Sequence, residues 1–184
     1  MEKIKIGIIL GSTREGRVCP QVGQWVLKVA EERKNADFEI VDLAEFDLPF
    51  FGTGSESENQ QKIDAWKKKI AALDGYIFIV PEYNHSITGV LKNALDSAYE
   101  EWNDKVAGIV SYGATGGTRA AEHLRGILAE LAIATVRSNP AFSIFTDFTD
   151  SKEFQPADLH LDVVQRMLDQ VLSWGRALKT VRNS

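Results

Sequence analysis

The feature that most restricts the fold of this chain is a repeated alternation of short apolar runs with segments of helical periodicity. Apolar runs at residues 3–10, 38–43, 76–80 and 106–110 predict strands, and either 134–136 or 142–145 supplies a fifth. Apolar residues recur at helical spacing in segments that begin at Pro20 and that cover 59–73, 91–102, 118–131 and 156–181. Strands that alternate with helices in this way predict a doubly wound α/β sandwich built on a parallel sheet.

Length and composition restrict the class of protein further. The 184 residues are enough for a sizeable core, and we expect residues 1–184 to form a single domain. The formal net charge of −5 argues against nucleic acid or an anionic membrane as a partner. A single cysteine excludes an intramolecular disulfide, no apolar run is long enough to span a bilayer, and the N-terminus lacks a signal-peptide pattern. We therefore expect a cytoplasmic protein.

The loop that follows the first predicted strand, GSTREGR at residues 11–17, has the features of an anion site. In doubly wound sheets ligands bind beyond the carboxyl ends of the strands, and here the loop precedes a helix whose first N–H groups and dipole attract anions. Arg14 and Arg17 add positive charge, while Ser12 and Thr13 add hydroxyl donors. The loop predicts a phosphate site; the alternative is that both arginines are simply exposed loop charges.

Other known site patterns do not fit the sequence. A dinucleotide fingerprint needs glycine where Thr13 stands, and a P-loop needs a lysine after Gly16. Cys19 lacks the arginine of a phosphatase loop and is expected to pack, and Asp42, near the end of the second strand, is expected to be a solvated acid. No histidine pair has metal-ligand spacing and Ser111 lies in no G-x-S-x-G string, so neither a metal ligand nor a catalytic side chain is predicted.

Two further loops suggest the walls of a pocket. PEYNHS at residues 81–86 leaves the third strand through a proline, which should hold the peptide extended and leave its backbone groups open to a planar ligand. SYGATGG at 111–117 carries three glycines, which let a backbone approach a ligand closely. The long connection at 44–58 is a candidate lid or rim.

In this order, the segments GSTREGRVCPQVGQWV, PEYNHSITGVLKNALD and VSYGATGGTRAAEHLR resemble the NAD(P)H-dependent FMN reductase family, flavodoxin-like enzymes that include quinone, azo-dye and chromate reductases. The resemblance extends from about residue 3 to about residue 140. It implies a three-layer sandwich with a five-stranded parallel sheet in the order 2-1-3-4-5 and helices on both faces. It also implies FMN as the cofactor and NAD(P)H as the co-substrate.

Carried over residue by residue, the resemblance implies a complete set of FMN contacts. Ser12, Arg14 and Arg17 would hold the phosphate; Pro81, Glu82, Tyr83 and Asn84 would line one side of the flavin ring; Ser111, Tyr112 and Gly113 would approach its other edge. The chain departs from many relatives at Thr88, where they have proline, and at Ser97, where they have tryptophan.

We expect a ping-pong reaction in which NAD(P)H gives a hydride to bound FMN and leaves before a quinone, azo compound, free flavin or metal oxyanion takes the electrons. Two alternatives stay open: a flavodoxin-type electron carrier, and a flavin-dependent redox sensor that regulates a partner protein. The resemblance further implies a homodimer or homotetramer, with the helix at 91–102 near the partner subunit.

Overall fold

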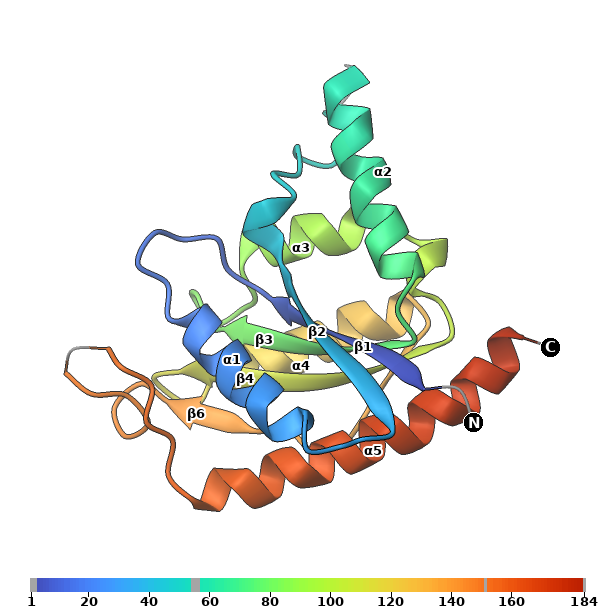
Figure 1. Cartoon of the computed structure of the whole chain (residues 1–184). Helices are drawn as coiled ribbons and strands as arrows, with labels where there is room; N and C mark the ends of the chain where they lie inside the picture. The colour runs from blue at the N-terminus through green and yellow to red at the C-terminus, as the bar shows by residue number, and fades with distance from the viewer. Residues whose placement is uncertain (1–2, 54–56, 151, 184) are drawn as a thin grey trace.

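The fold is a parallel sheet covered by helices on both faces (Figure 1). The computed structural model describes residues 3–53, 57–150 and 152–183. The strands follow the order β2-β1-β3-β4-β5 and every pair is parallel, so the expected order is confirmed. The strands are β1 (Ile4–Leu10), β2 (Ala36–Asp42), β3 (Gly75–Pro81), β4 (Lys105–Gly113), β5 (Ile133–Thr135) and β6 (Ala141–Ser143).

Two layers of helices enclose two hydrophobic cores. The helices are α1 (Cys19–Ala30), α2 (Ser57–Ala71), α3 (Gly89–Asp96), α4 (Thr118–Glu130) and α5 (Leu159–Arg182), with 3-10 turns η1 (Leu43–Glu45) and η2 (Glu100–Trp102). Apolar side chains of α1 and α5 pack on one face of the sheet, and those of α2, α3 and α4 pack on the other. Both faces of β3 and β4 are therefore buried, which explains why their sequences are continuously apolar.

The fifth position of the sheet is divided between both segments that the sequence offered as alternatives. β5 pairs with the beginning of β4 and β6 with its end. Between them, the Nδ2 of Asn139 donates to the carbonyls of Ile109 and Pro140, each at 3.0 Å. A side-chain amide thus takes the place of ladder hydrogen bonds at a point where Pro140 has no N–H to offer.

The prediction of one helix from 91 to 102 is wrong beyond Asp96. There the Oγ of Ser97 donates to the carbonyl of Asn93 at 2.7 Å, and the chain turns into η2. Trp102 is fully buried, its Nε1 donates to the carbonyl of Leu95 at 3.1 Å, and its ring meets that of Tyr76 at 4.9 Å. The helix-like apolar spacing therefore arises from a tryptophan that packs back onto the sheet.

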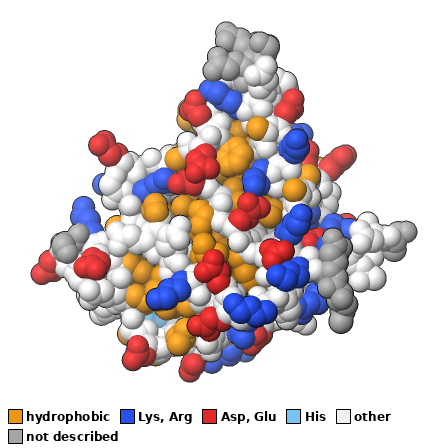
Figure 2. Space-filling model, viewed as in Figure 1, with side chains coloured by type: hydrophobic (Ala, Val, Ile, Leu, Met, Phe, Trp, Pro, Cys, Tyr) orange, Lys and Arg blue, Asp and Glu red, His pale blue; other side chains and the backbone are white. Residues whose placement is uncertain are grey.

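The loops that follow β1, β3, β4 and β6 gather at one edge of the sheet. In Figure 1 the dark-blue loop after β1 and the orange loop after β6 both lie at the left of the molecule. The long connection at 44–58 begins within η1 and ends in the first residues of α2, whereas residues 54–56 lie outside the described residues. Across the part of the chain that is described, no helix has the length and apolar content to cross a membrane. On the face seen in Figure 2, basic and acidic side chains are interspersed.

Candidate functional site

A cavity of about 650 Å³ opens at the carboxyl ends of β1, β3 and β4. Its size falls within the range of small-molecule binding sites. Of the ten site residues predicted from the sequence, it is lined by Arg14, Arg17, Pro81, Glu82, Tyr83, Tyr112 and Gly113. Ser12, Asn84 and Ser111 are not among the lining residues; Ser12 and Asn84 lie in the loops after β1 and β3, and Ser111 lies near the end of β4. The topology thus brings the three predicted segments to one place.

The loop after β1 is fixed to the strand and helix beside it. The N–H of Gly11 donates to the carbonyl of Ile79 at 2.9 Å, and a Cβ on Gly11 would lie only 2.6 Å from that oxygen, so the position requires glycine. Thr88 donates its hydroxyl to the carbonyl of Gly11 at 2.6 Å and accepts the N–H of Leu91 at the start of α3. The buried Oγ of Ser12 lies 3.2 Å from the Tyr83 hydroxyl. Thr88 therefore secures the loop by hydrogen bonds.

Arg17 is held in an ion pair that the sequence did not predict. Its guanidinium donates to both carboxylate oxygens of Asp42, at 2.7 and 2.6 Å, and to the carbonyl of Ser12. Both charged side chains are only 17% exposed, and the hydrogen bond to Asp42 raises the pKa of Arg17. The expectation that Asp42 is solvated is wrong, and the charge of Arg17 is largely balanced. Arg14 makes no ion pair with any residue of the described ranges.

The backbone around the start of α1 has donors to spare. The N–H groups of Thr13, Gly16 and Val18 donate to no partner among the residues that the structure describes. Val18 caps α1 without a side-chain hydrogen bond, so the first turn keeps its positive end. Free N–H groups beside Arg14 form a donor set that suits a phosphate.

The turn after β3 is tighter than the expected extended peptide. Tyr83 and Ser86 exchange two backbone hydrogen bonds, at 3.0 and 3.1 Å. Asn84 and His85 between them have φ values of 50° and 67°, as in the two-residue turns of β-hairpins. The peptide is therefore extended only as far as Tyr83, and Asn84 serves as a turn residue.

Glu82 is buried in the wall of the cavity and joins it to α4. Its side chain is 5% exposed and accepts the Nε of Arg119 at 2.6 Å and the backbone N–H of Arg119 at 3.2 Å. Burial by itself would raise the pKa of Glu82, but the hydrogen bond and charge of Arg119 and the N–H groups at the start of α4 lower it overall. The Nη1 of Arg119 also lies 2.9 Å from the Nε2 of His85. Sequence reasoning missed Arg119, although an arginine two residues after a glycine pair, at the start of a predicted helix, was a signal.

The loop after β4 uses its polar and glycine residues mainly to fold itself. Ser111 is fully buried and donates to the carbonyl of Gly116 at 2.7 Å. Gly117 has a φ of 71°, and a Cβ there would lie 2.6 Å from the backbone nitrogen of Tyr112. Gly117 thus makes its close approach to its own strand, whereas Gly113 lines the cavity. The Tyr112 ring is buried beside Cys19, whose pKa burial raises to about 12, so Cys19 is an unreactive packing residue as expected.

A fourth wall, between β6 and α5, was not predicted. Ile144, Phe145, Phe148, Thr149, Asp150 and Lys152 line the cavity from this side. The segment is anchored by aromatic contacts, with the Phe154 ring 4.9 Å from Phe142 and 5.0 Å from Phe148. The buried carboxylate of Asp147 accepts the N–H of Ser143 and lies 2.9 Å from the Nε2 of His160. The only trace in the sequence is a cluster of phenylalanines at residues 142–154.

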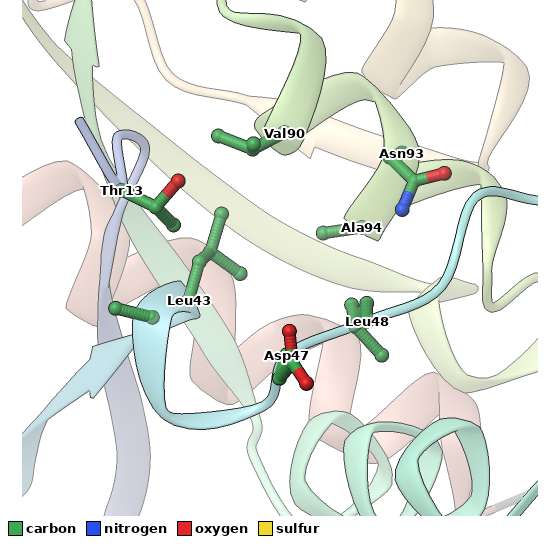
Figure 3. Close-up of a pocket in the computed structure, with 8 residues that line it drawn as sticks. Thr13, Leu43, Asp47, Leu48, Val90, Asn93 and Ala94 are labelled. Carbon is green, nitrogen blue, oxygen red and sulfur yellow. The ribbon is translucent and has the colours of Figure 1, made fainter. Parts of the chain in front are cut away.

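A second cavity, of about 300 Å³, lies on the other side of the loop after β1 (Figure 3). Figure 3 shows Leu43 on one side and Val90 and Ala94 of α3 on the other. No lysine, arginine or histidine is among the described residues that line it, and Asp47 contributes a negative charge. It does not suit a phosphate, so the larger of these two cavities, at the carboxyl ends of β1, β3 and β4, is the candidate site.

Comparison with known proteins agrees with this geometry. Residues 4–147 match the sequence model of a family described as NADPH-dependent FMN reductase. An NAD(P)H-dependent FMN reductase of Schizosaccharomyces pombe is 37% identical over 149 residues, which cover 78% of this chain and 74% of that protein. A quinone reductase of Escherichia coli K12 is 32% identical over 150 residues, which cover 77% of this chain and 77% of that protein. Among solved structures, the flavoenzyme FerB of Paracoccus denitrificans has a TM-score of 0.75 at 21% identity over 95% of this chain and 98% of its own, which shows a shared fold.

Proposed function

The chain belongs to the NADPH-dependent FMN reductase family, and from this premise we propose that it reduces quinones, azo compounds, free flavin or metal oxyanions at the larger cavity. Membership makes it an NAD(P)H-dependent oxidoreductase that works through FMN. The observation that carries the proposal is a cavity of about 650 Å³ that is lined by Arg14, Arg17 and Val18, the N-cap of α1. Relatives with more than 30% identity are named FMN reductases and quinone reductases, which favours an enzyme over an electron carrier.

We propose that FMN occupies this cavity with its phosphate at the start of α1. Arg14 and the free N–H groups would contact the phosphate, while Ser12 and the paired Arg17 would hold the loop in shape. The other contacts would come from Pro81, Glu82, Tyr83 and Asn84 on one side and Ser111, Tyr112 and Gly113 on the other. Since Glu82, Ser111 and Tyr112 are buried, they would contribute backbone atoms and rigidity.

When bound, FMN supplies the redox chemistry: it accepts a hydride from NAD(P)H and returns electrons to an acceptor. The contribution of the chain is to bind and orient. The ion pairs of Glu82 and Arg17 and the bonds of Thr88 keep the walls of the cavity fixed, so that the reacting groups meet in a defined geometry. Nicotinamide and acceptor would use the same opening in turn, which is the physical basis of a ping-pong order.

We also propose that residues 1–184 act as one domain in the cytoplasm and assemble into a homodimer or homotetramer. Exposed apolar side chains gather near α3: Phe50, Phe51 and Tyr99 are 77%, 68% and 57% exposed, and the N–H of Phe51 donates to Asn93 in α3. Such side chains are typical of an interface between subunits. A sedimentation experiment that finds only 20.4 kDa monomers at micromolar concentration would contradict the assembly.

The test of the proposed function combines binding with kinetics. Apoprotein is titrated with FMN, the complex is mixed with NADPH or NADH in a stopped-flow instrument, and the reduced protein is mixed with each acceptor. We expect FMN binding, rapid loss of flavin absorbance, and parallel double-reciprocal plots. Arg14→Ala should weaken FMN binding, while Arg166→Ala, on the exposed side of α5, should not. Failure to bind FMN would refute the proposal, and intersecting plots would refute the ping-pong order.

A further inference from the structure

The wall of the cavity between β6 and α5 continues past residue 147, where the match to the family ends. We propose that Lys152 in this wall, held in place by Gln21, is a further ligand of the FMN phosphate and makes the chain prefer FMN to riboflavin. This inference rests on the proposed function, since it assumes that the phosphate lies at the start of α1.

Residues 148–150 and 152–154 form a turn in which Lys152 lines the cavity. Its ends form an antiparallel bridge. Within it, the N–H of Lys152 donates to the carbonyl of Thr149 at 2.8 Å, and the N–H of Glu153 donates to the Thr149 hydroxyl at 3.0 Å. Lys152 itself has a φ of 64°, a conformation that the turn imposes. The backbone of Lys152 is therefore fixed although it lies at the surface.

Gln21 ties this turn to the start of α1. Its Nε2 donates to the carbonyl of Lys152 at 3.2 Å, and its Oε1 accepts the N–H of Phe154 at 2.9 Å. Gln21 belongs to the first turn of α1, the helix whose N-terminal N–H groups face the phosphate loop. One side-chain amide thus holds the backbone of Lys152 beside the positive end of that helix.

The balance of charge around the cavity assigns Lys152 its role. Five charged residues line it: Arg14, Arg17, Glu82, Asp150 and Lys152. Asp42 neutralises Arg17 and Arg119 neutralises Glu82, and both partners lie outside the lining. Within the described ranges, Arg14 and Lys152 have no ion-pair partner, and Asp150 is an exposed acid. Without Lys152 the remaining charges of Arg14 and Asp150 would cancel, and a phosphate dianion would meet no net positive charge from side chains of the lining.

The experiment compares two flavins that differ only in the phosphate. Apoprotein of the native chain and of Lys152→Met is titrated with FMN and with riboflavin by quenching of flavin fluorescence. We expect Lys152→Met to raise the Kd for FMN about tenfold, the loss of one charge-assisted hydrogen bond, and to change the Kd for riboflavin less than twofold. Lys152→Arg should restore FMN binding. Gln21→Ala should also weaken the binding of FMN more than that of riboflavin, because it releases the backbone of Lys152. Lys34→Met, an exposed lysine beyond the far end of α1, is the matched control.

Several results would overturn the inference. An unchanged Kd for FMN in Lys152→Met would do so, and so would equal losses for FMN and riboflavin, which would indicate a change in the shape of the wall. NADPH also carries a phosphate monoester, so KM values for NADPH and NADH are measured on the FMN-loaded variant. A loss confined to NADPH would place Lys152 at that phosphate and contradict its assignment to FMN. If the native chain binds neither flavin, the proposed function itself fails.

Discussion

Replacing Arg119 by methionine should leave the carboxylate of Glu82 without its ion-pair partner inside the wall of the cavity. Glu82 is 5% exposed and would keep only the backbone N–H of residue 119 at 3.2 Å as a donor from this position. Breaking a buried ion pair costs about 3–5 kcal/mol, because the remaining charge is desolvated. Since the Arg119 side chain is 40% exposed and water can reach this side, we expect the free energy of unfolding to fall by the lower end of this range, about 3 kcal/mol at pH 7.

The pH dependence of this loss is the diagnostic measurement. Arg119 lowers the pKa of Glu82 from its ordinary 4.5, so the pair contributes stability above pH 4.5 that disappears as the pH falls through the lowered value. In Arg119→Met the carboxylate can escape the penalty by taking up a proton, and the loss should shrink to about 1 kcal/mol at pH 4. Urea unfolding followed by tryptophan fluorescence at pH 7 and pH 4 measures both values. Arg166→Met, which removes an exposed arginine, should cost less than about 0.5 kcal/mol. A loss of equal size at both pH values, or none at pH 7, would refute the reasoning.

Three further predictions concern buried positions. Burial lowers the pKa of Lys105 to about 8, so between pH 8 and 10.5 the unfolded chain binds more protons than the folded chain. The free energy of unfolding of the native chain, relative to that of Lys105→Met, should therefore rise by about 2 kcal/mol from pH 7 to pH 9.5. Urea unfolding at the two pH values measures this rise. Gly117 has a φ of 71°, and the Cβ of Gly117→Ala would lie 2.6 Å from the nitrogen of Tyr112, so this variant should lose at least about 2 kcal/mol of stability. Gly126→Ala, in an open part of α4, should be neutral or stabilising, and thermal unfolding compares the two variants. Cys19, buried and with its pKa raised to about 12, should resist iodoacetamide at pH 8 until urea unfolds the chain, and alkylation of the folded protein, read by mass spectrometry, would contradict this.

Local patterns predicted the layout of the sheet well because both faces of its central strands are buried. The runs at 76–80 and 106–110 are apolar at nearly every position, and an apolar run of this short length is typical of a strand that is buried on both faces. The pattern failed at Trp102, whose apolar contact with the sheet does not depend on helical geometry. It was also ambiguous at the fifth strand position, where three-residue strands carry too few residues for a period to appear.

The candidate site also has features that the sequence predicted and features that depend on the tertiary structure. The sequence by itself determined which loops meet, since consecutive βα units place the carboxyl ends of their strands at one edge, and it predicted an anion site at residues 11–17. Only the tertiary structure decided which charges are available there. Asp42 and Arg119 come from other elements and neutralise Arg17 and Glu82. Gln21 donates to the carbonyl of Lys152, 131 residues away, in a turn that lines the same cavity as Arg14. Ion pairs and hydrogen bonds of this kind depend on distances of about 3 Å between atoms far apart in the chain, and no periodicity or local motif encodes such distances.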